Sequence, residues 1–210
     1  MAWRRRDAMV KNLAEGLLKT GALQFGTFTL PDGRDTPYYI NLHALPSFPG
    51  AYSAVVDALA GVIRQKVPKA GAVCAVSFQG LFFAAPVAIA LKRPLLYTKG
   101  IREPGGKSVE GEVRPDWRVV AVNDLAESGE SILAAAEAVT DEGGELRDAV
   151  VLIDRLEGAR EKLHKKGIAL HAVVDVIELG DALLSMDLIS ESDIKAITRS
   201  VGRAGQVRRK

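Results

Sequence analysis

The sequence predicts an α/β fold built around a mainly parallel sheet. Short apolar runs of strand length recur along the chain, and segments with helical apolar spacing lie between several of them. The runs are residues 72–77, 94–98, 118–122, 146–153 and 168–176. A helix between two buried strands implies right-handed βαβ units. Strands that are apolar on both faces are typical of a parallel sheet covered by helices.

The chain length predicts a single domain with a small N-terminal element. An apolar stripe over 7–19 predicts an amphipathic helix. Two extended pieces, 23–30 and 37–42, flank a polar turn and predict a hairpin. We therefore expect one domain over 1–210, divided into a helix-and-hairpin element at 1–45, a core at 46–190, and a C-terminal helix with a basic tail at 191–210.

Composition favours an ordinary globular protein of a reducing compartment. The chain is 48% hydrophobic and 26% charged, with a net charge of +2 that does not by itself demand a nucleic-acid or membrane partner. Its single cysteine, Cys74, lies in an apolar run and excludes an intrachain disulfide. The longest apolar stretch, 81–91, is too short to cross a bilayer, and no signal-like segment follows the basic start. These features predict a cytoplasmic protein.

Residues 123–130 form the expected strand-to-helix loop of the central strand. Such a loop lies at the carboxyl end of a strand, where the next helix offers unpaired N–H groups to an anion. Asp124 suits ribose hydroxyls, while Ser128, Gly129 and Ser131 suit a phosphate. The loop therefore predicts a sugar-phosphate site.

Three segments resemble orotate phosphoribosyltransferases. The loop, VNDLAESGES, resembles the phosphoribosyl diphosphate (PRPP) signature of type I phosphoribosyltransferases, roughly V-[DE]-D-V-x-T-T-G-x-S. Residues 21–43, GALQFGTFTLPDGRDTPYYINLH, resemble the N-terminal hood of the orotate enzymes, and DRLEGARE at 154–161 resembles their D-R-x-x-G-A-x-E. The resemblance covers about 21–191. It implies the Rossmann-like parallel sheet of the type I phosphoribosyltransferase fold with an N-terminal hood of a helix and a β-hairpin.

The same resemblance implies a reaction and a set of site residues. Such enzymes transfer phosphoribosyl from PRPP to orotate, giving orotidine monophosphate and diphosphate in pyrimidine nucleotide biosynthesis. Arg155 is expected to hold the orotate carboxylate, helped by Phe28 and Glu127, because a planar guanidinium pairs bidentately with a carboxylate. Mg²⁺ is expected to bind through PRPP, with Asp124 as its candidate protein ligand. The PRPP-binding residues expected from the motif are Asn123, Asp124, Glu127, Ser128, Gly129, Glu130 and Ser131.

Residues 99–110, KGIREPGGKSVE, stand where the family has its catalytic flap. Because it contains three glycines and a proline, this run cannot form a hydrophobic core of its own, which favours a mobile loop. The resemblance implies that Lys99, Arg102 and Lys107 neutralise the departing diphosphate. It also implies a homodimer in which this flap acts on the neighbour's site.

Several residues depart from the family pattern. Glu127 replaces a threonine of the phosphate loop, Asn123 replaces the first acid, and Gly100 replaces a lysine of the flap. Bulky Phe78 and Gln79 occupy a joint that is expected to be small. A carboxylate about 4 Å from a phosphate repels it by roughly 4 kcal/mol at an effective dielectric near 20. An active enzyme therefore requires Glu127 to turn away from the phosphate or to lie beside a cation.

Three interpretations remain open from the sequence. The first is an orotate phosphoribosyltransferase with a divergent loop. The second is a paralogue of the same fold that has lost PRPP chemistry and binds another ligand or a protein. The third, a nucleic-acid-binding regulator, rests on the basic residues at both ends of the chain but lacks a helix-turn-helix.

Overall fold

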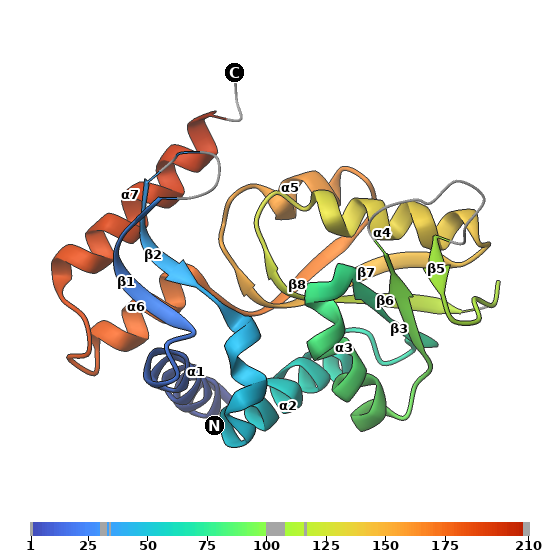
Figure 1. Cartoon of the computed structure of the whole chain (residues 1–210), viewed down its shortest axis with the longest axis horizontal. Helices are drawn as coiled ribbons and strands as arrows, with labels where there is room; N and C mark the ends of the chain where they lie inside the picture. Colours follow the sequence, from blue (N-terminus) through green and yellow to red (C-terminus); the bar gives the residue numbers. More distant parts are fainter. Residues whose placement is uncertain (1, 30–32, 34, 100–107, 116, 208–210) are drawn as a thin grey trace. The chain divides into compact units, whose positions relative to one another are not determined.

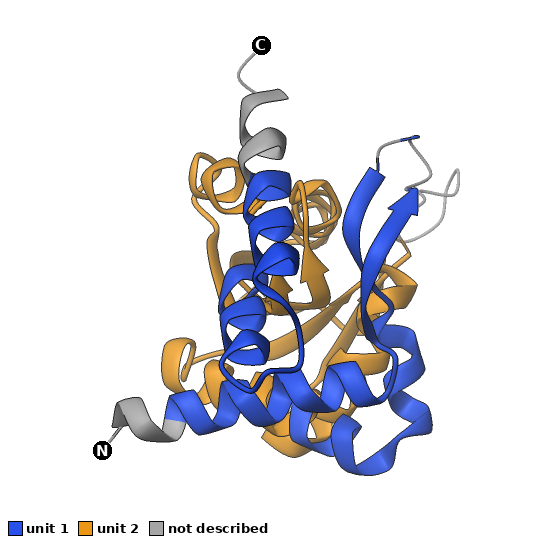
Figure 2. Ribbon diagram, turned by 90° about the vertical axis from the view of Figure 1, so that its left-hand side faces the viewer, with its two compact units in different colours: residues 1–55, 174–210 blue, residues 56–173 orange. Residues whose placement is uncertain are grey.

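The computed structural model describes residues 2–29, 33, 35–99, 108–115 and 117–207. The chain forms two compact units, Met1–Val55 with Val174–Lys210 and Val56–Val173, coloured separately in Figure 2. Among the described residues, no helix is long and apolar enough to cross a membrane.

The second unit contains a six-stranded sheet in the order β5-β4-β3-β6-β7-β8. Strand β3 pairs in parallel with β4 and β6, and β6 pairs in parallel with β7. The short β5 pairs antiparallel with β4. The strands are β3 (Ala72–Val76), β4 (Leu95–Thr98), β5 (Val109–Glu110), β6 (Arg118–Ala126), β7 (Glu145–Asp154) and β8 (Ala169–Asp175). The sequence prediction of an α/β fold with a mainly parallel sheet is thus confirmed.

Helices cover both faces of this sheet. Helix α3 (Ser77–Leu91) lies on one face, and α4 (Glu130–Asp141) with α5 (Ala159–His164) lies on the other (Figure 1). Helix α4 turns Ile132, Ala135 and Val139 inward because they recur at helical spacing, and each is at most 2% exposed. They pack in a cluster that includes residues of β3, β6 and β7. This packing fixes the end of β6 and the start of α4, between which the candidate phosphate loop lies.

The first unit contains the helix and hairpin expected from the N-terminal sequence. Strands β1 (Leu23–Thr29) and β2 (Asp35–Ile40) pair antiparallel, with Phe25 opposite Tyr38. The C-terminal part of the chain adds α6, which begins with a capping box between Asp175 and Glu178. The helices of this unit are α1 (Ala2–Lys19), the 3₁₀ helix η1 (Leu42–Ser47), α6 (Val176–Leu184) and α7 (Glu191–Val207), while α2 (Pro49–Lys66) crosses the boundary between the units.

Two element boundaries differ from the sequence prediction at the site. Strand β6 does not end at residue 122 but continues to Ala126, because β7 pairs with it as far as Ala126 opposite Asp154. The loop therefore shrinks from 123–130 to 127–129. Residues 78–80 were expected as a joint, yet they form the first turn of α3. Ser77, with a φ of 58°, turns the chain directly from β3 into this helix.

Candidate active site

The candidate phosphate loop consists of Glu127, Ser128 and Gly129 between β6 and α4. Gly129 has a φ of 79° and caps the helix in a left-handed conformation. A Cβ atom at this position would lie 3.4 Å from the Ala159 Cα atom and 3.3 Å from the Leu163 Cγ atom. Glycine is thus favoured by the backbone conformation, and the neighbouring α5 leaves little room for a side chain. The tight turn directs the first N–H groups of the 12-residue helix α4 toward the loop, as an anion site needs.

Asn123 and Asp124 lie within the strand and are 7% and 6% exposed. The Asn123 side-chain amide donates to the Leu125 carbonyl oxygen at 3.0 Å. The Asp124 carboxylate accepts from the Leu125 N–H at 2.8 Å. Both side chains are therefore held rigidly at the carboxyl end of β6. Among the described residues, no partner is found for the Asn123 Oδ1 atom.

Arg155 lies at the end of the neighbouring strand and joins two carboxylates. Its Nη1 atom lies 2.9 Å from the Glu127 Oε1 atom, and its Nε atom lies 3.0 Å from the Glu157 Oε1 atom. The side chains of Arg155 and Glu157 are 6% and 8% exposed, whereas that of Glu127 is 48% exposed. The Arg155 backbone N–H also donates to the Ala126 carbonyl oxygen at 2.9 Å. The arginine assigned to the base and the acid of the phosphate loop are thus in direct contact.

The second unusual carboxylate of the loop is also paired. Glu130, the first residue of α4, forms an ion pair with Lys162 of α5. As an acid in the first helical turn, Glu130 also interacts favourably with the helix dipole. Each extra carboxylate therefore has a cation beside it. The requirement that Glu127 lie beside a cation is met by Arg155.

Sequence reasoning missed the two partners that matter most here, Glu157 and Lys162. Both occur in the DRLEGAREK segment that had been assigned to the base. For Lys162 the signal was the added carboxylate Glu130, because a carboxylate near a phosphate site requires a compensating cation. Glu157 is a second anion beside Arg155, and the loop sequence holds no signal for it. Only the structure identifies which cations supply the compensation.

Pairing of β4 with β5 joins the two ends of the expected flap. Tyr97 pairs with Glu110 and Thr98 with Val109 across β4 and β5. Lys99 forms an ion pair with Glu110 at 2.8 Å. The other two candidate flap cations, Arg102 and Lys107, lie outside the described residues, and their catalytic role stays a prediction.

Phe28, the remaining candidate contact for orotate, belongs to the first unit. Its ring packs against that of Tyr39 on the facing strand, with centroids 5.6 Å apart. These two aromatic side chains therefore pack together within the hairpin. A role for Phe28 in binding orotate stays a prediction.

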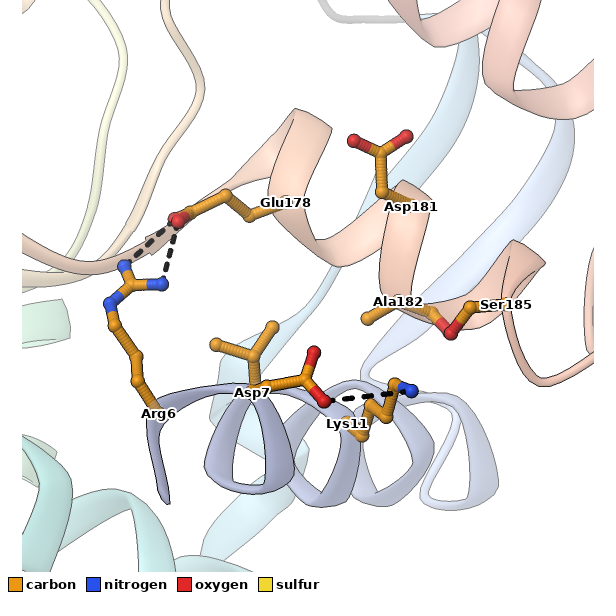
Figure 3. A pocket seen from close by; sticks show the side chains of 8 residues that line it. Arg6, Asp7, Lys11, Glu178, Asp181, Ala182 and Ser185 are labelled. Carbon is orange, nitrogen blue, oxygen red and sulfur yellow. Dashed lines mark hydrogen bonds and ion pairs between the residues drawn. The ribbon is translucent and has the colours of Figure 1, made fainter. Parts of the chain in front are cut away.

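The first unit also has a hollow of about 340 Å³ between α1 and α6 (Figure 3). Its prominent charges pair with one another: both guanidinium Nη atoms of Arg6 contact Glu178, at 2.7 and 3.1 Å, and Lys11 lies 3.7 Å from Asp7. The hydrogen bond and charge of Glu178 raise the pKa of Arg6 above its usual value. None of the sequence-predicted site residues lines this hollow.

The residues near the loop fit a magnesium ion carried by a diphosphate. Among the described residues, no group of three or more His, Cys, Asp or Glu side chains could hold a metal ion. One carboxylate, Asp124, is fixed at the strand end beside the loop. Mg²⁺ sites in phosphate-binding enzymes often use one or two carboxylates together with substrate oxygens and water. The donor set here suits that kind of site.

Comparison with known proteins identifies the family. The chain is 40% identical over 173 residues to an orotate phosphoribosyltransferase of Methanopyrus kandleri, covering 80% of this chain and 91% of that protein. This chain belongs to the orotate phosphoribosyltransferase family. No family model matches it.

Two solved structures resemble the chain. The UMP synthase of Leishmania donovani, 30% identical, superposes with a TM-score of 0.82 over 92% of this chain and 42% of that protein. The orotate phosphoribosyltransferase of Mycobacterium tuberculosis in complex with PRPP, 26% identical, superposes with a TM-score of 0.66 over 82% of this chain and 99% of that one. The type I phosphoribosyltransferase fold inferred from the sequence is thereby confirmed.

Proposed function

We propose that this protein transfers the phosphoribosyl group of PRPP to orotate, forming orotidine monophosphate and diphosphate for pyrimidine nucleotide synthesis. The observation that carries the proposal is the adjacency of the phosphate loop to Arg155, joined through Glu127 at 2.9 Å. A sugar-phosphate site next to a cation for a carboxylated base matches the two substrates of this reaction. Membership of the orotate phosphoribosyltransferase family supports it.

Within this proposal the loop binds PRPP. The N–H groups at the start of α4 and the hydroxyls of Ser128 and Ser131 suit the 5-phosphate, while Asp124 and Asn123 border the ribose. The related M. tuberculosis enzyme binds PRPP, which supports the assignment. Glu127 and Glu130 are compatible with phosphate binding because Arg155 and Lys162 compensate their charge.

The reaction requires the protein to position the two substrates and to compensate the charge that develops on them. Breaking the bond between the ribose and the diphosphate leaves positive charge on the sugar and negative charge on the leaving group, so no covalent intermediate with the protein is needed. Lys99, Arg102 and Lys107 are proposed to neutralise the departing diphosphate. A bound Mg²⁺, with Asp124 as its protein ligand, would supply further Lewis-acid neutralisation of the same group.

We also propose that the protein acts as a homodimer in which the flap of one subunit serves the other. An apolar stripe along the outside of α3 supports an interface between copies. Ile89 is 78% exposed and Phe78 is 60% exposed, and Phe82 and Ala85 continue the same stripe at helical spacing. Exposed apolar helix faces of this kind mark protein interfaces.

A cytoplasmic location is part of the same proposal. The sole cysteine, Cys74, is fully buried, as expected for a structural thiol of a reducing compartment. The alternative of a paralogue without PRPP chemistry was supported by the combined changes at Glu127, Gly100 and Phe78 and by the shortened flap. The ion pair with Arg155 removes the part of that support that came from Glu127.

The direct test is an assay with PRPP, Mg²⁺ and orotate. The purified protein is expected to consume orotate only when both PRPP and Mg²⁺ are present. Adenine in place of orotate is the control, and it should not be consumed. Absence of orotate consumption under conditions where the protein is folded and binds PRPP would refute the proposal.

A further inference from the structure

The contacts of Arg155 place a protein carboxylate where a substrate carboxylate is expected. Glu127 accepts a hydrogen bond from the Arg155 Nη1 atom at 2.9 Å. Glu157 contacts the Nε atom of the same guanidinium at 3.0 Å. The cation therefore already has two anions beside it. An incoming orotate carboxylate would be the third.

The three side chains differ in their freedom to move. Arg155 and Glu157 are buried, with 6% and 8% of their side chains exposed. Glu127 is 48% exposed and lies in the short loop before α4. A half-exposed glutamate can rotate into water at little cost, whereas burying an unpaired charge is expensive. Glu127 is thus the member of the cluster that can leave.

We propose that Glu127 is a specificity-determining residue that competes with the carboxylate of the base for Arg155. In the enzyme without a base, Glu127 occupies the guanidinium. Orotate displaces it, and the measured affinity for orotate is reduced by the free energy of breaking this pair. The inference rests on the proposed function. It gives Glu127 a competing role in place of the sequence expectation that this residue helps Arg155 to hold orotate.

Displacement of Glu127 also has a consequence for the other substrate. Once released from Arg155, the carboxylate loses its nearby cation while remaining in the phosphate loop. Its charge then repels the PRPP phosphates. Binding of the base and of PRPP should therefore oppose each other, and by thermodynamic linkage the effect is reciprocal.

The experiment measures binding of orotate and of orotate methyl ester by calorimetry to wild type, Glu127→Gln and Glu127→Thr. The ester is the neutral probe, because it lacks the anionic carboxylate that competes with Glu127. Both variants are expected to bind orotate about threefold to tenfold more tightly than wild type, as for release from one partly exposed ion pair. Affinity for the ester should change by less than twofold, within about 0.4 kcal/mol.

Glu137→Gln is the charge-matched control, since Glu137 is an exposed acid of α4 beyond the loop. It should leave orotate affinity unchanged. If Glu137→Gln binds orotate as much more tightly as the Glu127 variants do, the effect comes from net charge and the inference is overturned. Unchanged or weaker orotate binding by the Glu127 variants would also overturn it. In either case the wild-type protein would still turn over orotate with PRPP. Failure of the proposed function instead abolishes turnover in every variant, and if the variants also fail to bind orotate, both conclusions fall.

Discussion

The Oδ1 atom of Asn123 lies 2.9 Å from the position that a Cβ atom on Gly80 would occupy. The carbonyl oxygen of Val122 lies still closer to that position, at 2.7 Å. Only a glycine therefore lets the first turn of α3 pack against the end of β6. This contact couples the start of α3 to the strand that carries Asp124.

Gly80→Ala is accordingly expected to lower the free energy of unfolding by about 1–3 kcal/mol, as for overpacking of a close contact. Since the clash displaces the end of β6, PRPP affinity should fall as well. Chemical denaturation and PRPP calorimetry measure the two effects. Gly61→Ala in α2 is the control, because a Cβ atom there meets nothing within 4 Å. If the Gly80→Ala protein is as stable as wild type, the end of β6 can shift to accept the added methyl group without loss of stability, and the prediction is wrong.

Arg155→Lys keeps the positive charge at this buried position but removes the planar guanidinium group that can pair with a carboxylate through two hydrogen bonds. We expect orotate binding to weaken about tenfold to a hundredfold, corresponding to about 1.4–2.8 kcal/mol, with a smaller effect on PRPP. Calorimetry with each substrate separately gives the comparison. Arg160→Lys is a suitable control, since Arg160 pairs with Asp154 and the Leu170 carbonyl oxygen instead. An equal loss of both substrates in Arg155→Lys would indicate a structural role.

Cys74 should be unreactive in the folded protein. Burial raises the pKa of its thiol from the usual value to about 12, so the nucleophilic thiolate is scarce at pH 8. We expect a thiol reagent to label the native protein far more slowly than the protein in denaturant. Because the folded pKa is raised, its contribution to stability is present at neutral pH and is lost as pH rises from about 9 toward 12.

Cys74→Ala lacks this thiol, so its free energy of unfolding is expected to fall less than that of wild type as pH rises above about 9. Equilibrium unfolding at neutral pH and at pH 10 compares the variant with wild type. Labelling of the native protein at the rate of the denatured one would contradict the burial of this thiol.

Ile89→Glu should disrupt the proposed dimer. The side chain is 78% exposed on α3, so the substitution places a charge within the apolar stripe without disturbing the core. Sedimentation equilibrium is expected to show a shift from dimer to monomer. Ala134→Glu, at an exposed position of α4, is the control and should leave the mass unchanged. A wild-type protein that is monomeric at all concentrations would refute the interface.

The sheet could be predicted because most residues of its strands are apolar and the strands are separated by segments of helical period. The end of β6 could not, because Asn123 and Asp124 are polar and look like loop residues. Pairing with β7 extends the strand through them, as the register of Leu125 with Ile153 shows. Long-range pairing of this kind leaves no trace in the local sequence.

The site was predictable in its parts but not in its contacts. The motif matches identified Arg155 and the phosphate loop separately, as parts of two different segments. Their direct contact depends on two strand ends meeting in the sheet. Electrostatic repulsion required a cation near Glu127 or a side chain turned away from the phosphate, but the sequence could not identify Arg155 as that cation. Nothing in the local sequence connects Glu130 with Lys162, which lies on another helix.

The most direct test of the account is identification of the reaction products. Wild-type protein incubated with PRPP, Mg²⁺ and orotate should form orotidine monophosphate and diphosphate in equal amounts, matching the orotate consumed, as measured by chromatography with mass spectrometry. Formation should require all three components. PRPP binding without any orotidine monophosphate, by protein that is folded and dimeric, would contradict the assignment and favour a paralogue that has lost the reaction.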